Sequence, residues 1–246
     1  MASRVDKLPD APRLGASIRA AGVDFYFQSI RLVMANLAWG ACLLIDLIIA
    51  AFFSPLLGLV LSPLLAIPLV GVFRLGAIIA RGEPPDFADV TAAWARYARP
   101  ALLLGASLVF AATVLIVDAV GAASSGSTVA WILATLAGWG MLGVGTFALI
   151  AWPILVDPRR EQMRAAQRLR LAGLMLAAFP GRMVGLAIIC GVILLASTIA
   201  FAALISISLA FVALLACRYV LPAADRLEAR LNRVAGEADQ SQDVGE

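Results

Sequence analysis

Two carboxylates, Asp46 and Asp118, stand inside long apolar stretches of this sequence. If these stretches cross a membrane, each carboxylate costs about 2.5 to 3.5 kcal/mol or more at the bilayer centre, which makes function the first hypothesis for it. Asp46 is the deeper residue and could bind a substrate, a proton or a partner group; a protonated or hydrogen-bonded structural carboxyl is the alternative. Asp118 lies nearer the end of its stretch, at the level of the membrane surface.

The other usual reactive groups are missing or poorly spaced. The chain has no histidine, which excludes Ser-His, Cys-His and His-x-x-x-His chemistry. Cys42, Cys190 and Cys217 lie in apolar stretches without Cys-x-x-Cys spacing, which argues against a zinc site or a disulfide framework. We therefore expect no metal, no cofactor and no enzymatic activity. A membrane enzyme built on Asp46 and Asp118 would need both carboxylates to face one cavity.

The composition indicates a membrane protein. Hydrophobic residues make up 62% of the chain, charged residues 14%, and the mean hydropathy is +0.95. Soluble domains average about 45–50% apolar and about 25% charged residues, so a soluble fold is excluded. A spanning helix needs about 20 apolar residues, and the length of 246 residues leaves room for five or six spans.

The distribution of positive charge predicts the topology. All 19 Lys and Arg residues fall within residues 1–31, 74–99, 159–182 and 218–233. Cytoplasmic loops carry such an excess of Lys and Arg, so an even number of crossings should separate these segments. The last apolar run, Met183 to Leu221, would form about 58 Å of helix, nearly twice the thickness of the hydrocarbon core. Two short spans with a turn near residues 197–203 are therefore predicted.

The predicted fold is an all-α polytopic membrane protein with six transmembrane helices in three hairpins and both termini in the cytoplasm. Cytoplasmic amphipathic helices are expected at the membrane surface near residues 14–30, 86–99, 157–179 and 222–234. Residues 1–235 form one membrane domain, and residues 236–246 a disordered acidic tail. The spans are predicted at about 32–53, 57–80, 101–120, 129–156, 183–200 and 203–221.

Three features of this layout stay open in the sequence. Residues 54–63 form either a tight outer hairpin or a re-entrant segment. Pro68 predicts a kink in the second span. The three units of surface helix and hairpin, which start near residues 14, 86 and 157, suggest an internal repeat, although the sequence identity between them is negligible.

Arg160, Arg164 and Arg168 recur every four residues, which predicts one basic face of a surface helix. We expect this face to contact anionic lipid or an acidic partner. The net charge of +3 likewise favours lipid headgroups over nucleic acid.

Small and polar residues in the spans predict helix packing. Asn36 could donate a hydrogen bond to a neighbouring helix, and Gly181 and Gly185 form a Gly-x-x-x-Gly pair. Ser206 stands in a series of small residues with Ala202 and Ala210. These surfaces also allow a homo-oligomer.

Several short segments also follow the order found in a known family. Over about residues 30–200 the chain resembles the YesL-like family of small bacterial integral membrane proteins. The resemblance implies an accessory to a carbohydrate importer and offers no catalytic residues. The matching segments are Asn36–Trp39, Pro68, Arg81–Glu83 with Asp86–Phe87, Arg99–Gly105 leading to Asp118, Trp152–Leu155 and Ala177–Arg182.

We therefore expect a non-enzymatic multi-pass protein of the bacterial cytoplasmic (inner) membrane. It would act as an accessory or scaffold in contact with a transporter subunit, for example of a carbohydrate importer. The alternative is a small transporter or channel that uses Asp46 as its binding or coupling carboxylate. In that case the Pro-rich second span would be a broken helix.

Overall fold

The computed structural model describes residues 13–125 and 127–243, with side chains for residues 13–124 and 127–233. Within these ranges every regular element is helical, and six helical segments are long and apolar enough to cross a membrane. The protein is thus an all-helical polytopic membrane protein. Its elements are α1 (Leu14–Phe52), α2 (Pro55–Leu61), η1 (Ser62–Leu65), α3 (Ala66–Ala80), α4 (Phe87–Ser125), α5 (Thr128–Val156), η2 (Pro158–Arg160), α6 (Ala165–Ala178), α7 (Pro180–Ile199), α8 (Phe201–Ala203), η3 (Leu204–Ser208) and α9 (Leu209–Asp243).

The first hairpin pairs α1 with α2, η1 and α3. α1 contains both the expected surface segment and the first span, joined at a kink where Gln28 has non-helical dihedral angles. The chain turns at Ser54, whose side chain accepts a hydrogen bond from the Leu56 N–H and caps α2. The turn itself is thus confined to Phe53 and Ser54, and residues 55–61 already belong to the returning helix α2. The second span is interrupted at η1, whereas Pro68 lies in the first turn of α3, where proline is tolerated.

The second hairpin consists of α4 and α5. Gly82, with a φ of 78°, turns the chain between α3 and α4 in a conformation that favours glycine. The expected surface helix at 86–99 and the third span form one helix, α4, with Pro100 inside it. Ser127 caps α5 by accepting a hydrogen bond from the Ala130 N–H.

The third hairpin turns at Ala200, within the window expected from the sequence. Its returning span begins with α8 and the π-helix η3 and continues as α9. α9 runs through Pro222 without a separate surface helix, and it continues to Asp243, where the sequence analysis expected a disordered tail. Ala, Glu and Gln have high helix propensity, and an existing helix propagates easily into such residues. Residues 244–246 lie outside the described ranges.

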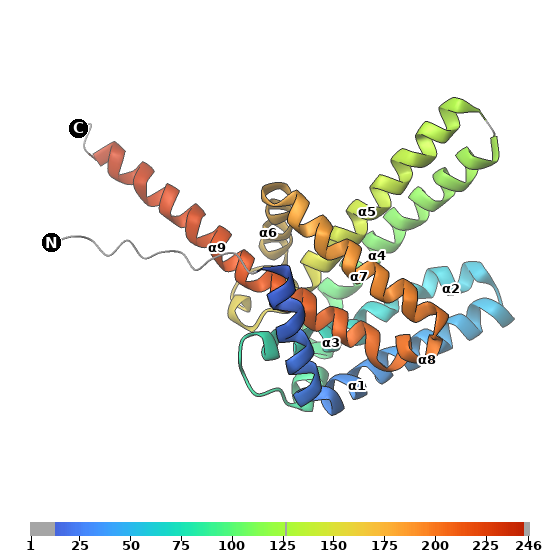
Figure 1. Cartoon of the computed structure of the whole chain (residues 1–246), viewed down its shortest axis with the longest axis horizontal. Coiled ribbons are helices and arrows are strands. Elements are labelled where there is room, and N and C mark those ends of the chain that lie inside the picture. The colour runs from blue at the N-terminus through green and yellow to red at the C-terminus, as the bar shows by residue number, and fades with distance from the viewer. Residues whose placement is uncertain (1–12, 126, 244–246) are drawn as a thin grey trace.

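The three hairpins point in one direction (Figure 1). Their turns lie on one side of the molecule, whereas the start of α1, α6 and the end of α9 lie on the other. We call this second side the basic end; it comprises the start of α1, the α3–α4 connection, η2, α6 and α9 from Arg218 onward. The α4–α5 hairpin diverges from the other two toward its turn (Figure 1).

The core is concentrated around α3, α9 and the last turns of α5. Leu75, Leu155, Leu214 and Leu215 are fully buried there. In the most apolar stretch of the last span, 67% of the residues are buried inside the protein. In the corresponding stretch of α4, 17% are buried. The half of α4 nearest its turn to α5 therefore contributes little to the core of the described chain.

A buried ionic cluster closes the basic end. Arg81, just after α3, donates hydrogen bonds to Asp157 (3.0 and 2.5 Å) and to Asp225 on α9 (2.5 Å). The Asp157 side chain is fully buried, and that of Arg81 is 5% exposed. Burial by itself would lower the pKa of Arg81, but the hydrogen bonds and charges of Asp225 and Asp157 outweigh it and raise the pKa. Arg81 thus stays charged and joins α3 to the ends of α5 and α9.

Further ion pairs at the basic end join helices of all three hairpins. Glu161 accepts hydrogen bonds from Arg74 on α3 (2.6 Å) and Arg96 on α4 (2.5 Å). Arg218 on α9 pairs with Asp24 on α1 at 2.5 Å. Together with the buried Arg81–Asp157 pair, these contacts link α1, α3, α4 and α9 at the basic end.

Candidate functional site

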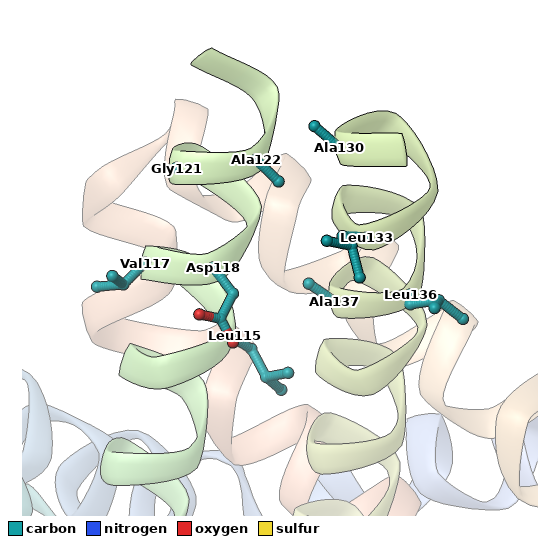
Figure 2. Close-up of a pocket in the computed structure, with 9 residues that line it drawn as sticks. All are labelled: Leu115, Val117, Asp118, Gly121, Ala122, Ala130, Leu133, Leu136 and Ala137. Carbon is teal, nitrogen blue, oxygen red and sulfur yellow. The ribbon is translucent and has the colours of Figure 1, made fainter. Parts of the chain in front are cut away.

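A groove lies between α4 and α5 in the halves of these helices nearest their turn (Figure 2). We call it the α4–α5 groove; its volume is about 810 Å³. Small residues on both helices leave the space open, because their side chains are too short to meet across it. The groove is lined chiefly by Leu115, Asp118 and Gly121 from α4 and by Ala130, Leu133 and Ala137 from α5.

Asp118 is the ionisable residue of this groove. Its side chain is exposed and lies on the side of α4 that faces α5 (Figure 2). No described residue forms an ion pair or hydrogen bond with its carboxylate, and the chain has no Lys or Arg between residues 100 and 158. An unpaired carboxylate in apolar surroundings favours a cation from another molecule. The groove is therefore the candidate functional site.

Asp46 lies apart from this groove, in the first hairpin. It is partly buried, and one of its carboxylate oxygens has no hydrogen-bond partner among the described residues. It lines an apolar cavity of about 190 Å³ together with Cys42 and Ile49 of α1 and Leu61 and Leu65 of the second span. The two cavities share no lining residue. The structure thus does not bring Asp46 and Asp118 together.

Comparisons of the chain with protein-family models, with curated proteins and with solved structures give no match. The resemblance to the YesL-like family consequently stays a prediction. The described residues also contain no group of three or more His, Cys, Asp or Glu side chains arranged to hold a metal ion.

Asn36 makes the cross-helix contact expected of it. It is fully buried on α1, and its amide donates hydrogen bonds to the carbonyl oxygens of Leu204 (3.1 Å) and Ile205 (2.6 Å) in the π-helix η3. A π-helix displaces backbone carbonyls from their ordinary α-helical partners. Asn36 therefore serves to join the first and third hairpins.

The small residues singled out in the sequence do not pack as expected. A Cβ atom added at Gly181 or at Gly185 would meet no atom within 4 Å. Ser206 donates its hydroxyl hydrogen bond to Ala202 in the preceding turn of its own chain segment. Close helix approaches occur at other glycines, among them Gly40, where an added Cβ would lie 2.4 Å from Cγ2 of Ile205.

Arg160, Arg164 and Arg168 do not form one basic face. Arg160 belongs to η2, and α6 begins only after Arg164, so the spacing of four does not place the three residues on one helix. Arg160 is 3% exposed and pairs with Asp157, Asp225 and Glu228, and Arg168 is also buried. Arg164 alone of the three is exposed. The expected contact with lipid or a partner is thus wrong for Arg160, whose donors are already used inside the protein.

The ionic cluster was missed in the sequence, although a signal existed. Arg81, Asp157 and Asp225 each follow the inner end of a different predicted span. Spans in paired hairpins bring these ends to one membrane level, so opposite charges there could have been matched. Their side-chain distances, however, depend on how the hairpins pack.

Proposed function

We propose that this protein is a non-enzymatic accessory or scaffold protein of a membrane complex, and that a transmembrane helix of the partner docks in the α4–α5 groove. The single observation that carries the proposal is the unpaired carboxylate of Asp118 in a groove of apolar and small side chains. Small residues allow close helix approach, which is the main source of affinity between helices in lipid.

The surroundings of the groove support a protein partner. Val117, Leu133 and Leu136 are 63%, 55% and 60% exposed, and Trp139 on the same hairpin is 66% exposed. The packed core of the chain lies elsewhere, so this hairpin offers two helical faces for contact. A partner helix with a Lys or Arg near its outer end would complement Asp118. A second copy in the same orientation would not, because every Lys and Arg of this chain lies in the basic segments.

The class of the partner is proposed from the sequence. The resemblance to the YesL-like family favours a subunit of a carbohydrate importer in the bacterial inner membrane. The charge distribution favours a cytoplasmic location for the basic end and both termini. A reporter fused after residue 246 and one inserted at residue 126 should accordingly report from opposite sides of the membrane.

Site-specific photo-crosslinking tests the docking site. A photo-reactive residue at Leu133 in the groove should crosslink to a transporter subunit in native membranes, whereas one at Leu195, exposed on α7, should not. The variant Asp118→Asn should reduce co-purification of that subunit in mild detergent. Purification of the chain alone, or crosslinking only to another copy of it, would contradict the proposal.

A small transporter or channel is the second candidate. It is favoured by the buried, unpartnered oxygen of Asp46 beside the interrupted second span. Reconstituted vesicles with the wild-type protein would then show substrate or proton flux that Asp46→Asn abolishes. The accessory role predicts no flux with either protein.

A further inference from the structure

A second cavity, separate from the α4–α5 groove, lies at the basic end. We call it the basic-end pocket; its volume is about 440 Å³, which is within the range of small-molecule sites. It lies between the first turns of α4, the end of α5 and the start of α6. Its polar lining is formed by Arg96, Tyr97, Glu161, Gln162 and Arg168.

Arg168 provides a fixed positive charge in this pocket. Its side chain is buried, its guanidinium donates to the carbonyl oxygens of Leu155 and Met163, and it lies 5.6 Å from the centre of the Tyr97 ring. Unlike Arg81, it has no carboxylate partner among the described residues. The carbonyl oxygens and the aromatic ring therefore fix the position of the guanidinium, but no negative charge of the described residues compensates its positive charge.

The hydroxyl of Tyr97 is a second polar group of this pocket. Tyr97 is 4% exposed, and its hydroxyl makes no hydrogen bond of normal geometry with the described residues; its oxygen lies near the Arg96 guanidinium, which can only donate to it, so its hydrogen has no acceptor. A buried O–H group without an acceptor is unfavourable. The hydroxyl can thus donate to a ligand that enters the pocket.

The balance of charge defines the ligand. Two guanidinium groups, those of Arg96 and Arg168, and one carboxylate, that of Glu161, line the pocket. Glu161 pairs with Arg96 and, from outside the lining, with Arg74. Arg96 is 60% exposed and can reorient, whereas Arg168 cannot. This excess of forked donors suits an anion with several acceptor oxygens, and arginine is the preferred side chain for phosphate.

We propose that the basic-end pocket binds a phosphate group, held by Arg168 and the Tyr97 hydroxyl from within and by Arg96 from the rim. The phosphate belongs either to an anionic lipid headgroup or to a soluble phosphorylated molecule. This site does not depend on the accessory role or on the α4–α5 groove.

Binding measurements on the full chain distinguish the two sources. The protein is reconstituted in phosphatidylcholine nanodiscs, and binding is measured with inorganic phosphate in one arm and with added phosphatidylglycerol in the other. Saturable one-to-one binding is expected in at least one arm. Binding of phosphatidylglycerol that phosphate does not displace assigns the headgroup; binding of phosphate alone assigns a soluble ligand.

Two variants and a control test the residues. Tyr97→Phe, which removes only the hydroxyl, should weaken binding about tenfold, and Arg168→Gln should weaken it further. Arg170→Gln, exposed on α6 and outside the pocket, should bind as the wild type. If Arg168→Gln does not fold, the affinity of the Tyr97→Phe variant alone tests the proposal. Failure of saturable binding in both arms, or unchanged binding by Tyr97→Phe, overturns the proposal.

Discussion

The basic end and the α4–α5 groove both contain carboxylates, but their surroundings differ. Asp157 is fully buried at the basic end and accepts hydrogen bonds from Arg81 and Arg160. Asp118 in the groove is exposed and lies among Leu, Ala and Gly side chains without a partner among the described residues. An aspartate thus links helices through ion pairs at the basic end, whereas in the α4–α5 groove an aspartate makes no such contact with the described residues.

This difference shows where the chain is complete by itself. At the basic end, ion pairs connect all three hairpins, and the side chains of Arg81 and Asp157 are buried among them. At the groove, the space between the side chains of α4 and α5 is open to lipid or to another protein. Substitutions at the basic end should therefore change stability, and substitutions in the groove should change association.

The largest effect is expected from Arg81→Ala. It leaves the buried Asp157 with fewer partners, and breaking a buried ion pair costs about 3–5 kcal/mol. Denaturation in detergent should show this loss. The control Arg170→Ala, at an exposed position, should change the free energy of unfolding by less than about 0.5 kcal/mol. Equal stability of the two variants would mean that the cluster does not hold the hairpins.

Gly40→Ala tests the contact between the first and third hairpins. The new methyl group would lie 3.0 Å from the carbonyl oxygen of Ile205, and such overpacking costs about 1–3 kcal/mol. Gly185→Ala is the matched control, because its Cβ meets no neighbour and both changes alter helix propensity alike. The thermal midpoint should fall for Gly40→Ala only; a similar fall for Gly185→Ala would place a helix contact there.

Asn36→Leu should destabilise the protein by about 1 kcal/mol. The substitution removes the hydrogen bonds to the carbonyl oxygens of Leu204 and Ile205, and bonds between membrane helices contribute up to about 1.7 kcal/mol. Hydrogen exchange of η3 should rise in the variant. Unchanged exchange would show that the π-helix does not depend on Asn36.

The smallest effect is expected from Ala137→Leu. The added atoms enter the open groove, so the free energy of unfolding should change by less than about 0.5 kcal/mol. Ala213→Leu, at a fully buried position of α9, should cost about 1–3 kcal/mol by overpacking. If Ala137→Leu is equally costly, the groove is packed in the isolated chain. If Ala137→Leu keeps its stability but loses the crosslink from residue 133 to the partner, the groove serves association, whereas the basic end serves stability.

The spans were predictable because each requires a continuous apolar segment of fixed length. The expected fourth span at 129–156 and the turn near 197–203 match α5 and Ala200 closely. Surface helices were harder to predict, since amphipathic segments such as residues 86–99 and 222–234 continue the adjoining spans as single helices. A change of polarity along the chain does not by itself end a helix.

The candidate sites were predicted only in part. The sequence identified Asp118 and Asp46 because intramembrane carboxylates are rare, but it gave no information on which cavity each lines. It assigned Arg160 to the surface because spacing does not reveal that Asp225 and Glu228 lie beside it. It favoured Gly185 for packing, whereas Gly40 makes the close contact.

By itself, the sequence determined the membrane class, the number of apolar helices and the segments that carry positive charge. Hydrophobicity and charge are properties of each residue, so their order along the chain can be analysed without coordinates. Only the tertiary structure decided which charges are paired, which carboxylate faces an open groove and where a buried arginine without a carboxylate partner packs over a tyrosine ring. These features depend on distances between side chains far apart in sequence, which are set when the hairpins pack together.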